Sequence, residues 1–142
     1  MKILVINGPN LNLLGTREPD IYGSMDYAGL CEYVFDAAKE LSIEVSVVQS
    51  NCEGEIIDTI HKAKGAYDAL IINPAAYTHY SYAIYDAILA VSLPIVEVHI
   101  SNVYKREAFR HKSVIAPACI GQITGLGVYG YAAALRYLKE NI

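Results

Sequence analysis

Two residues of an apolar run in the second half of the chain carry side chains that could exchange protons. Glu97 and His99 stand two positions apart in Pro94–Ile100, which reads as a strand, so their side chains share one face. A carboxylate beside an imidazole can fix its tautomer and support its protonated form, as a general acid requires. The alternative is a polar pair satisfied by neighbouring helix termini.

The segment Gly8–Gly23 holds a second set of candidates. Strand-to-helix connections in α/β domains usually take about two to six residues, and longer ones are commonly functional. Glycines and prolines prevent its continuation as a strand or helix, while its leucines argue against disorder. We therefore expect an active-site lid, with a solvated surface loop as the alternative.

Within this lid, Tyr22 could act as a base. A phenol with a pKa of about 10 is a poor base at neutral pH, but a nearby guanidinium favours its ionised form, and Arg17 is five residues away. Tyr22 with Arg17 as the base, and His99 with Glu97 as the acid, would make an elimination or isomerisation site.

Two other functional hypotheses, a metal site and a nucleotide site, have weaker support in the sequence. His79, Glu97 and His99 could ligate a metal ion, although no HxH or HExxH spacing supports this. The segment Gly125–Gly130 matches GxGxxG, but no acidic residue follows about twenty positions later to hold a ribose. We interpret these glycines as a tight turn with close helix–sheet packing, and we expect neither a metal nor a cofactor.

Composition narrows the class of protein. The 142 residues carry a net charge of −4, which argues against a nucleic-acid partner, while a local basic cluster could bind an anion. The longest apolar run is too short to cross a membrane, and the first apolar run is broken too early for a signal peptide. The cysteines are three, widely spaced and outside any CxxC pair, which indicates reduced thiols and a cytoplasmic location. The basic cluster comprises Lys105, Arg106, Arg110, His111 and Lys112.

Strands and helices are expected to alternate along one catalytic domain, residues 1–142. The expected strands are Lys2–Asn7, Ile43–Gln49, Ala69–Asn73, Pro94–Ile100 and Ile120–Thr124. The expected helices run from a cap at Ser24 to Leu41, from a capping box at Ser50–Glu53 to about Gly65, from Tyr82 to Val91, and from Tyr129 to Lys139.

This alternation predicts an α/β fold, a flavodoxin-like three-layer sandwich with a five-stranded parallel sheet in the order 2-1-3-4-5 and helices on both faces. Ligands of such sheets bind at the carboxyl ends of the strands, at the switch point between the first and third strands. The lid, the loop Asn73–Ser81 and His99 all converge there.

Four blocks of sequence closely resemble the type II 3-dehydroquinate dehydratases. They are Asn7-Gly-Pro-Asn-Leu-Asn-Leu-Leu-Gly15 with Arg17-Glu-Pro19 and Tyr22-Gly23, Asn73-Pro-Ala-Ala-Tyr-Thr-His79 with Asp86, Glu97-Val-His-Ile-Ser-Asn102 with Arg106-Glu107 and Phe109-Arg-His111, and Gly125-Leu-Gly127 with Gly130-Tyr131. The resemblance implies a cytoplasmic hydro-lyase of the shikimate pathway and aromatic amino-acid biosynthesis. Its reaction would be the trans-elimination of water from 3-dehydroquinate to give 3-dehydroshikimate through an enolate, without metal or imine.

The resemblance also implies a role for each matching residue. Tyr22, helped by Arg17, would remove the proton next to the ketone, and His99, oriented by Glu97, would protonate the leaving hydroxyl. Asn10 would help hold the water at the enolate oxygen. The substrate carboxylate would be bound by Asn73 and the backbone amides of Ile100 and Ser101, and the ring hydroxyls by His79, Arg110 and Asp86.

The family implies assembly as well: a homododecamer made of four trimers, with Asp86 reaching into a neighbouring site. The helix Tyr82–Val91 supports this independently, because Asp86 points away from its predicted core stripe while tyrosines and Leu89 share that outer side. The sequence departs from the family pattern at Tyr80, Tyr82, Tyr85 and Tyr104, none of which is assigned a chemical step.

Two functions of other classes stay open from the residues alone. One is a flavodoxin-like module that binds an anionic metabolite without turnover. The other is a metal-dependent hydrolase that uses His79, Glu97 and His99.

Overall fold

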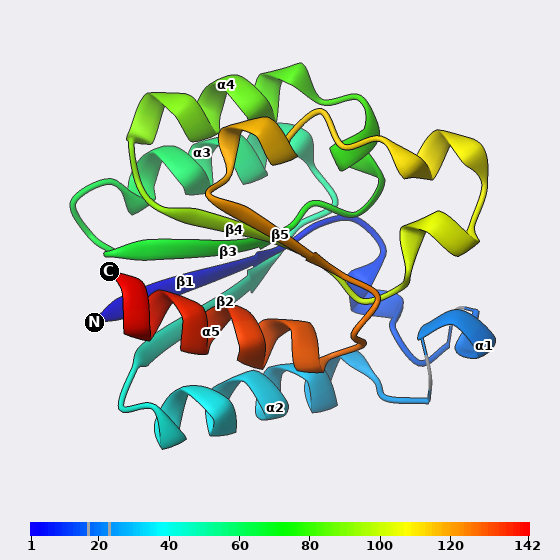
Figure 1. Cartoon of the computed structure of the whole chain (residues 1–142), viewed down its shortest axis with the longest axis horizontal. Helices are drawn as coiled ribbons and strands as arrows, with labels where there is room; N and C mark the ends of the chain where they lie inside the picture. The colour runs from blue at the N-terminus through cyan, green and yellow to red at the C-terminus, as the bar shows by residue number, and fades with distance from the viewer. Residues whose placement is uncertain (17, 23) are drawn as a thin grey trace.

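The computed structural model describes residues 1–16, 18–22 and 24–142, and of Pro19 and Tyr22 it describes the backbone only. Five parallel strands form one sheet in the order β2-β1-β3-β4-β5. Helices α2 and α5 cover one face of this sheet, and α3 and α4 cover the other (Figure 1). The predicted three-layer α/β fold and strand order are therefore confirmed. The strands are β1 (Lys2–Asn7), β2 (Glu44–Gln49), β3 (Ala69–Asn73), β4 (Ile95–His99) and β5 (Gly121–Thr124), and the helices are α1 (Pro19–Tyr22), α2 (Tyr27–Glu40), α3 (Glu53–Ala63), α4 (Tyr82–Val91) and α5 (Tyr129–Asn141).

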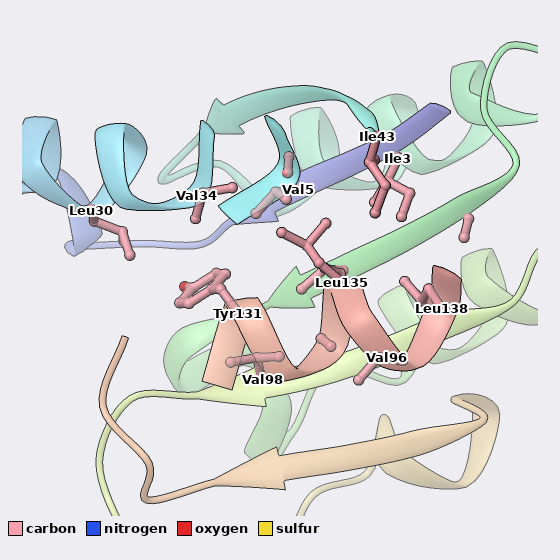
Figure 2. Close-up of a cluster of buried hydrophobic side chains, with 14 of the residues drawn as sticks. Ile3, Val5, Leu30, Val34, Ile43, Val96, Val98, Tyr131, Leu135 and Leu138 are labelled. Carbon is pink, nitrogen blue, oxygen red and sulfur yellow. The ribbon is translucent and has the colours of Figure 1, made fainter. Parts of the chain in front are cut away.

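The central strands read as continuous apolar runs because both of their faces are buried. Along β1, Ile3 and Val5 belong to the core under α2 and α5, which Figure 2 shows, whereas Leu4 and Ile6 belong to the core under α3 and α4. Successive side chains of a strand point to opposite faces, so one short run fills both cores. This double burial fixes the register of the sheet.

That register places polar side chains together at the carboxyl end of the sheet. Asn7, the last residue of β1, pairs with Asn73, the last residue of β3, and with Gln49 at the end of β2. The neighbouring β4 ends at His99. Because parallel strands end at the same edge, four adjacent strands present polar groups to one place.

Two helix starts differ from the sequence prediction. Helix α2 is capped by Asp26, whose carboxylate accepts a bond from the Gly29 amide at 2.8 Å, rather than by Ser24. Helix α3 has Cys52 as its N-cap. The predicted capping box at Ser50 is wrong because the Ser50 amide is still bonded to the Asn7 carbonyl at 3.0 Å, so the chain leaves the sheet too late for the helix to begin there.

The segment after β1 contains two short turns of helix, η1 (Leu11–Leu13) and α1. Leu11 and Leu14 are buried, which anchors its first part against the core. Arg17 and Gly23 lie outside the described residues, so the expected lid is only partly described. Other short 3₁₀ turns are η2 (Ala75–His79), η3 (Val103–Lys105), η4 (Ala108–His111) and η5 (Ala116–Ala118).

The glycine motif after β5 is a structural turn, as predicted. Gly125 and Gly127 have φ angles of 86° and 60°, in the left-handed region that favours glycine. A Cβ on Gly130 would lie 3.1 Å from the Val98 side chain, so the lack of one lets α5 pack closely on β4. Across the described ranges, the structure contains no helix of the length and apolarity that a membrane span needs.

Candidate active site

A pocket opens at the carboxyl ends of β1, β3 and β4, where the switch point of the sheet predicts a ligand site. Its wall includes most of the site residues that were predicted from the sequence. The lining residues are Pro9, Asn10, Leu11, Asn73, Ala75, Ala76, His79, His99, Ile100, Ser101, Val103, Arg106 and Arg110.

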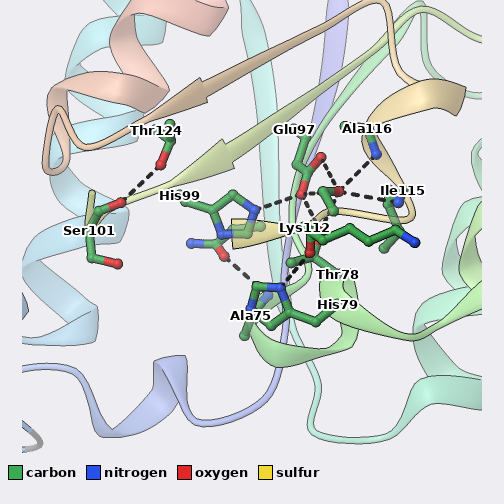
Figure 3. A network of polar contacts seen from close by, with 12 residues as sticks. Ala75, Thr78, His79, Glu97, His99, Ser101, Lys112, Ile115, Ala116 and Thr124 are labelled. Carbon is green, nitrogen blue, oxygen red and sulfur yellow. Dashed lines mark hydrogen bonds and ion pairs between the residues drawn. The ribbon is translucent and has the colours of Figure 1, made fainter. Parts of the chain in front are cut away.

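Glu97 and His99 form the polar centre of this site (Figure 3). His99 Nε2 lies 2.6 Å from Glu97 Oε1, and both residues are buried. Because the carboxylate accepts from Nε2–H, the ring nitrogen that can exchange a proton with a ligand is Nδ1. Glu97 and His99 are therefore paired, as their spacing predicted. Both side chains are buried and bonded to each other, whereas the alternative was a pair satisfied by neighbouring helix termini.

Burial alone would raise the pKa of the Glu97 carboxyl. The hydrogen bond and charge of His99, together with the hydroxyls of Thr78 and Ser113, outweigh burial and hold this pKa below its ordinary value. Glu97 therefore remains ionised at neutral pH and can accept the hydrogen bond from His99 Nε2.

His79 belongs to η2 and stands beside the same pocket. Its Nδ1 donates to the Lys112 carbonyl oxygen at 2.8 Å, which leaves Nε2 as an acceptor in the neutral ring. Burial is the main reason that the pKa of His79 is lowered. A neutral imidazole in this position suits hydrogen bonding to a hydroxyl group.

Asn73 is held by a buried network that sequence reasoning missed. The Tyr131 hydroxyl of α5 donates to Asn7 Oδ1 at 2.7 Å and accepts from Asn73 Nδ2 at 2.9 Å. The Ala75 amide donates to Asn73 Oδ1 at 3.2 Å. The two strand-terminal asparagines were visible in the sequence, but nothing in the sequence pairs them with a tyrosine of the last helix.

The peptide groups after β4 are oriented by the turn that leads into α5. The Gly125 and Gly127 amides donate to the carbonyls of His99 and Ile100 at 3.2 and 3.0 Å. In a trans peptide the N–H points opposite to the carbonyl, so the amides of Ile100 and Ser101 are directed away from that turn. Both residues line the pocket, as the binding of a carboxylate would require.

Asn10 reaches the pocket through a left-handed backbone conformation, with a φ of 69°. Asparagine tolerates this conformation better than most residues. The Asn10 amide donates to Asn51 Oδ1 at 2.9 Å, and Gln49 Nε2 donates to the Gly8 carbonyl at 3.1 Å. The start of the lid is therefore tied to the end of β2.

Two arginines supply positive charge to the wall. Arg110 was predicted, and its guanidinium lies 2.7 Å from Glu107 and stacks over the Phe109 ring. Arg106 was named in the basic cluster and in a family block but was given no role, yet it contacts the Ser101 hydroxyl at 3.4 Å and pairs with Glu18 of the lid segment at 3.3 Å. Its position in the middle of a charged run gave no signal that it would contact the site.

Asp86 is one predicted residue that the structure does not bring to this pocket. Asp86 is exposed on the outer side of α4, as the helical spacing predicted. Arg17 and the side chain of Tyr22 lie outside the described part of the chain. Within residues 1–16, 18–22 and 24–142, no three His, Cys, Asp or Glu side chains are arranged to hold a metal ion. His79 and His99 are directed instead at a carbonyl and a carboxylate.

The chain belongs to the class II dehydroquinase family, whose sequence profile matches residues 1–139. This membership confirms the resemblance carried by the four sequence blocks and favours neither of the two functions left open.

Individual relatives agree over almost the whole chain. A 3-dehydroquinate dehydratase of Caldicellulosiruptor saccharolyticus is 64% identical over 140 residues, 98% of this chain and 97% of the relative. One from Clostridium perfringens is 62% identical over 143 residues, 100% of this chain and 98% of the relative. The crystal structure of a type II dehydroquinase from Butyrivibrio crossotus matches with a TM-score of 0.95 and 55% identity, covering 97% of each chain.

Proposed function

We propose that this protein catalyses the dehydration of 3-dehydroquinate to 3-dehydroshikimate in the shikimate pathway. The observation that carries the proposal is the buried His99–Glu97 pair beside the pocket, found in a chain of the class II dehydroquinase family. The three free cysteines suit a reducing compartment, and we assign the reaction to the cytoplasm.

The reaction needs a base and an acid. Tyr22, as a phenolate favoured by the Arg17 guanidinium, takes the proton from the carbon next to the ketone, and the electron pair moves into an enolate. The enolate then re-forms the ketone and expels the hydroxyl, which His99 Nδ1 protonates so that it leaves as water. One C–H bond and one C–O bond break, one C=C bond forms, and there is no net oxidation. Glu97 stabilises the imidazolium before it gives up its proton.

The remaining predicted residues bind rather than react. The amides of Ile100 and Ser101 and the side chain of Asn73 hold the substrate carboxylate. His79 and Arg110 hold the ring hydroxyls, and Asn10 helps place the water at the enolate oxygen. Support for these roles comes from the shared pocket wall, to which all six residues contribute.

We also propose that four trimers form a dodecamer and that Asp86 completes the site of a neighbouring subunit. The inner side of α4 is buried through Ile84 and Ala87, yet its outer side carries Tyr82 and Leu89, which are 64% and 52% exposed. A helix that is apolar on both sides is usually covered on both. Asp86 lies on that outer side, away from its own pocket.

The test is direct. Purified protein mixed with 3-dehydroquinate should develop the ultraviolet absorbance of a conjugated enone, and chelator should leave the rate unchanged. Binding of 3-dehydroquinate without any absorbance change would instead identify a binding module. A rate abolished by chelator and restored by a metal ion would favour metal-dependent chemistry.

A further inference from the structure

Ser113, between η4 and η5, contacts both oxygens of the Glu97 carboxylate. Its Oγ lies 3.0 Å from Oε1 and 2.9 Å from Oε2. It also lies 2.8 Å from the Thr78 hydroxyl, which itself donates to Oε1. The carboxylate therefore accepts hydrogen bonds from two hydroxyls in addition to the imidazole of His99.

The direction of the Ser113 hydroxyl proton is set by the backbone around it. The amides of Ile115 and Ala116 donate to Ser113 Oγ at 3.2 and 2.9 Å (Figure 3). A hydroxyl has one proton and two lone pairs, so these amides occupy its acceptor sites and leave the proton for Glu97. Two donated bonds also polarise the hydroxyl and strengthen the bond that it makes.

The segment that carries Ser113 is itself tied to η2. The Val114 amide donates to the Thr78 carbonyl at 2.8 Å, and the preceding Lys112 carbonyl accepts from His79. This stretch therefore bonds His79 through the Lys112 carbonyl and reaches His99 through the Ser113 side chain and Glu97. Val114 and Ile115 are buried in the core under α3 and α4, which anchors this stretch.

We propose that Ser113 is a positioning residue for the general acid. It fixes the plane of the Glu97 carboxylate, and thereby the direction in which His99 presents Nδ1 to the leaving hydroxyl. This inference rests on the proposed function. Ser113 acts through Glu97 and not on the substrate.

The first experiment compares Ser113→Ala with the parent enzyme. Loss of the hydroxyl should lower kcat roughly 10- to 100-fold, because small misplacements of a reacting group cost about that much, while KM should change less than about threefold. Ser113→Thr, which keeps the hydroxyl, should restore most of the rate. Ser81→Ala is the matched control, because the Ser81 hydroxyl also accepts from a backbone amide, that of Ile84, but does not contact Glu97.

The pH profile of kcat separates positioning from a merely structural role. The Ser113 hydroxyl lowers the pKa of Glu97, so its removal should move the acidic limb of the profile to higher pH. The other ionisable groups that face the pair are His79 of η2, Arg110 of η4 and Cys119 after η5, and none of them is altered by this substitution. Ser81→Ala should leave the limb where it is.

A double-mutant cycle with Glu97→Gln tests whether Ser113 acts through Glu97. If Ser113 acts through Glu97, Ser113→Ala should cost much less in the Glu97→Gln background than in the parent. An equal cost in both backgrounds, or a parent-like rate and pH profile in Ser113→Ala, would overturn the proposal. If Ser113→Ala does not fold, Ser113→Cys, a weaker donor of similar size, takes its place against Ser113→Thr. A parent enzyme that fails to turn over 3-dehydroquinate would refute the proposed function instead.

Discussion

At the scale of single residues, the sharpest prediction concerns Tyr22. Tyr22→Phe should remove nearly all turnover, because in the proposed mechanism the phenol oxygen alone acts as the base, while substrate affinity should stay within a few-fold. Loss of a general base typically costs about 10² to 10⁴ in rate. Steady-state kinetics with a separate binding titration measure both quantities, and turnover within tenfold of the parent would refute the assignment.

Isotope exchange should separate the role of His99 from that of Tyr22. His99→Ala removes the proposed acid but leaves the proposed base, so exchange of the proton next to the ketone should continue faster than water is lost. Solvent deuterium incorporation, followed by NMR together with product formation, measures the two rates. If both rates fell by the same factor, a positional role for His99 would be the better account.

Glu97 should make the stability of the protein depend on pH in a defined window. Its pKa in the folded state is lowered from the ordinary value near 4.5, so its contribution is fully present above that pH and is lost as the pH falls through the folded value. The difference in unfolding free energy between the parent and Glu97→Gln should be constant from pH 7 to pH 5 and shrink below that. Urea unfolding at several pH values measures it. Glu40→Gln, on the exposed side of α2, is the control and should show a small difference throughout.

At the scale of elements, Tyr131 links α5 to β1 and β3. Tyr131→Phe leaves Asn7 Oδ1 and Asn73 Nδ2 without their buried partner, which should cost about 1–3 kcal/mol of stability and raise KM because Asn73 is no longer held. Tyr137→Phe, on the same helix but 46% exposed, should stay within about 0.5 kcal/mol of the parent. Chemical denaturation and steady-state kinetics test this together. Equal effects of the two substitutions would mean that the network does not hold the site.

The elements themselves could be read from the sequence because each has a local cause. The bounds of β3 and α4 match the prediction, since an apolar run ended by Pro74 marks the strand and an apolar stripe at helical spacing marks the helix. The start of α3 was misplaced because the bond from the Ser50 amide to β1 is a tertiary contact. Local patterns cannot report such contacts.

The difference between local patterns and tertiary contacts also explains which parts of the site were predicted and which were missed. Glu97 and His99 share a strand, so their spacing alone brings them together. Ser113, Tyr131 and Arg106 join the site only through folding of distant segments, for example across the 58 positions between Asn73 and Tyr131. Tyr131 and Arg106 stand in blocks that resemble the family, but no local pattern shows what any of these three residues contacts.

At the scale of the whole molecule, the site should be shared between subunits. Tyr22→Phe and Asp86→Ala should each be nearly inactive alone, but unfolded together and refolded they should regain a fraction of the activity. Some sites would then combine an intact Tyr22 with an intact Asp86 from a neighbour. Enone absorbance of the mixture measures the recovery, with each variant refolded alone as the control. A dead mixture of variants that demonstrably co-assemble would assign Asp86 to its own subunit's site or to none.

The Tyr131 network also affects the order in which the pocket can form during synthesis of the chain. A ribosome makes Asn7 first, Asn73 next and Tyr131 last, 124 positions after Asn7. The hydroxyl that orients both asparagines is therefore absent for most of the synthesis of the chain, although β1 and β3 can already pair. A nascent chain can hold a formed sheet and still lack a set pocket, and the docking of its final helix is the event that completes the enzyme.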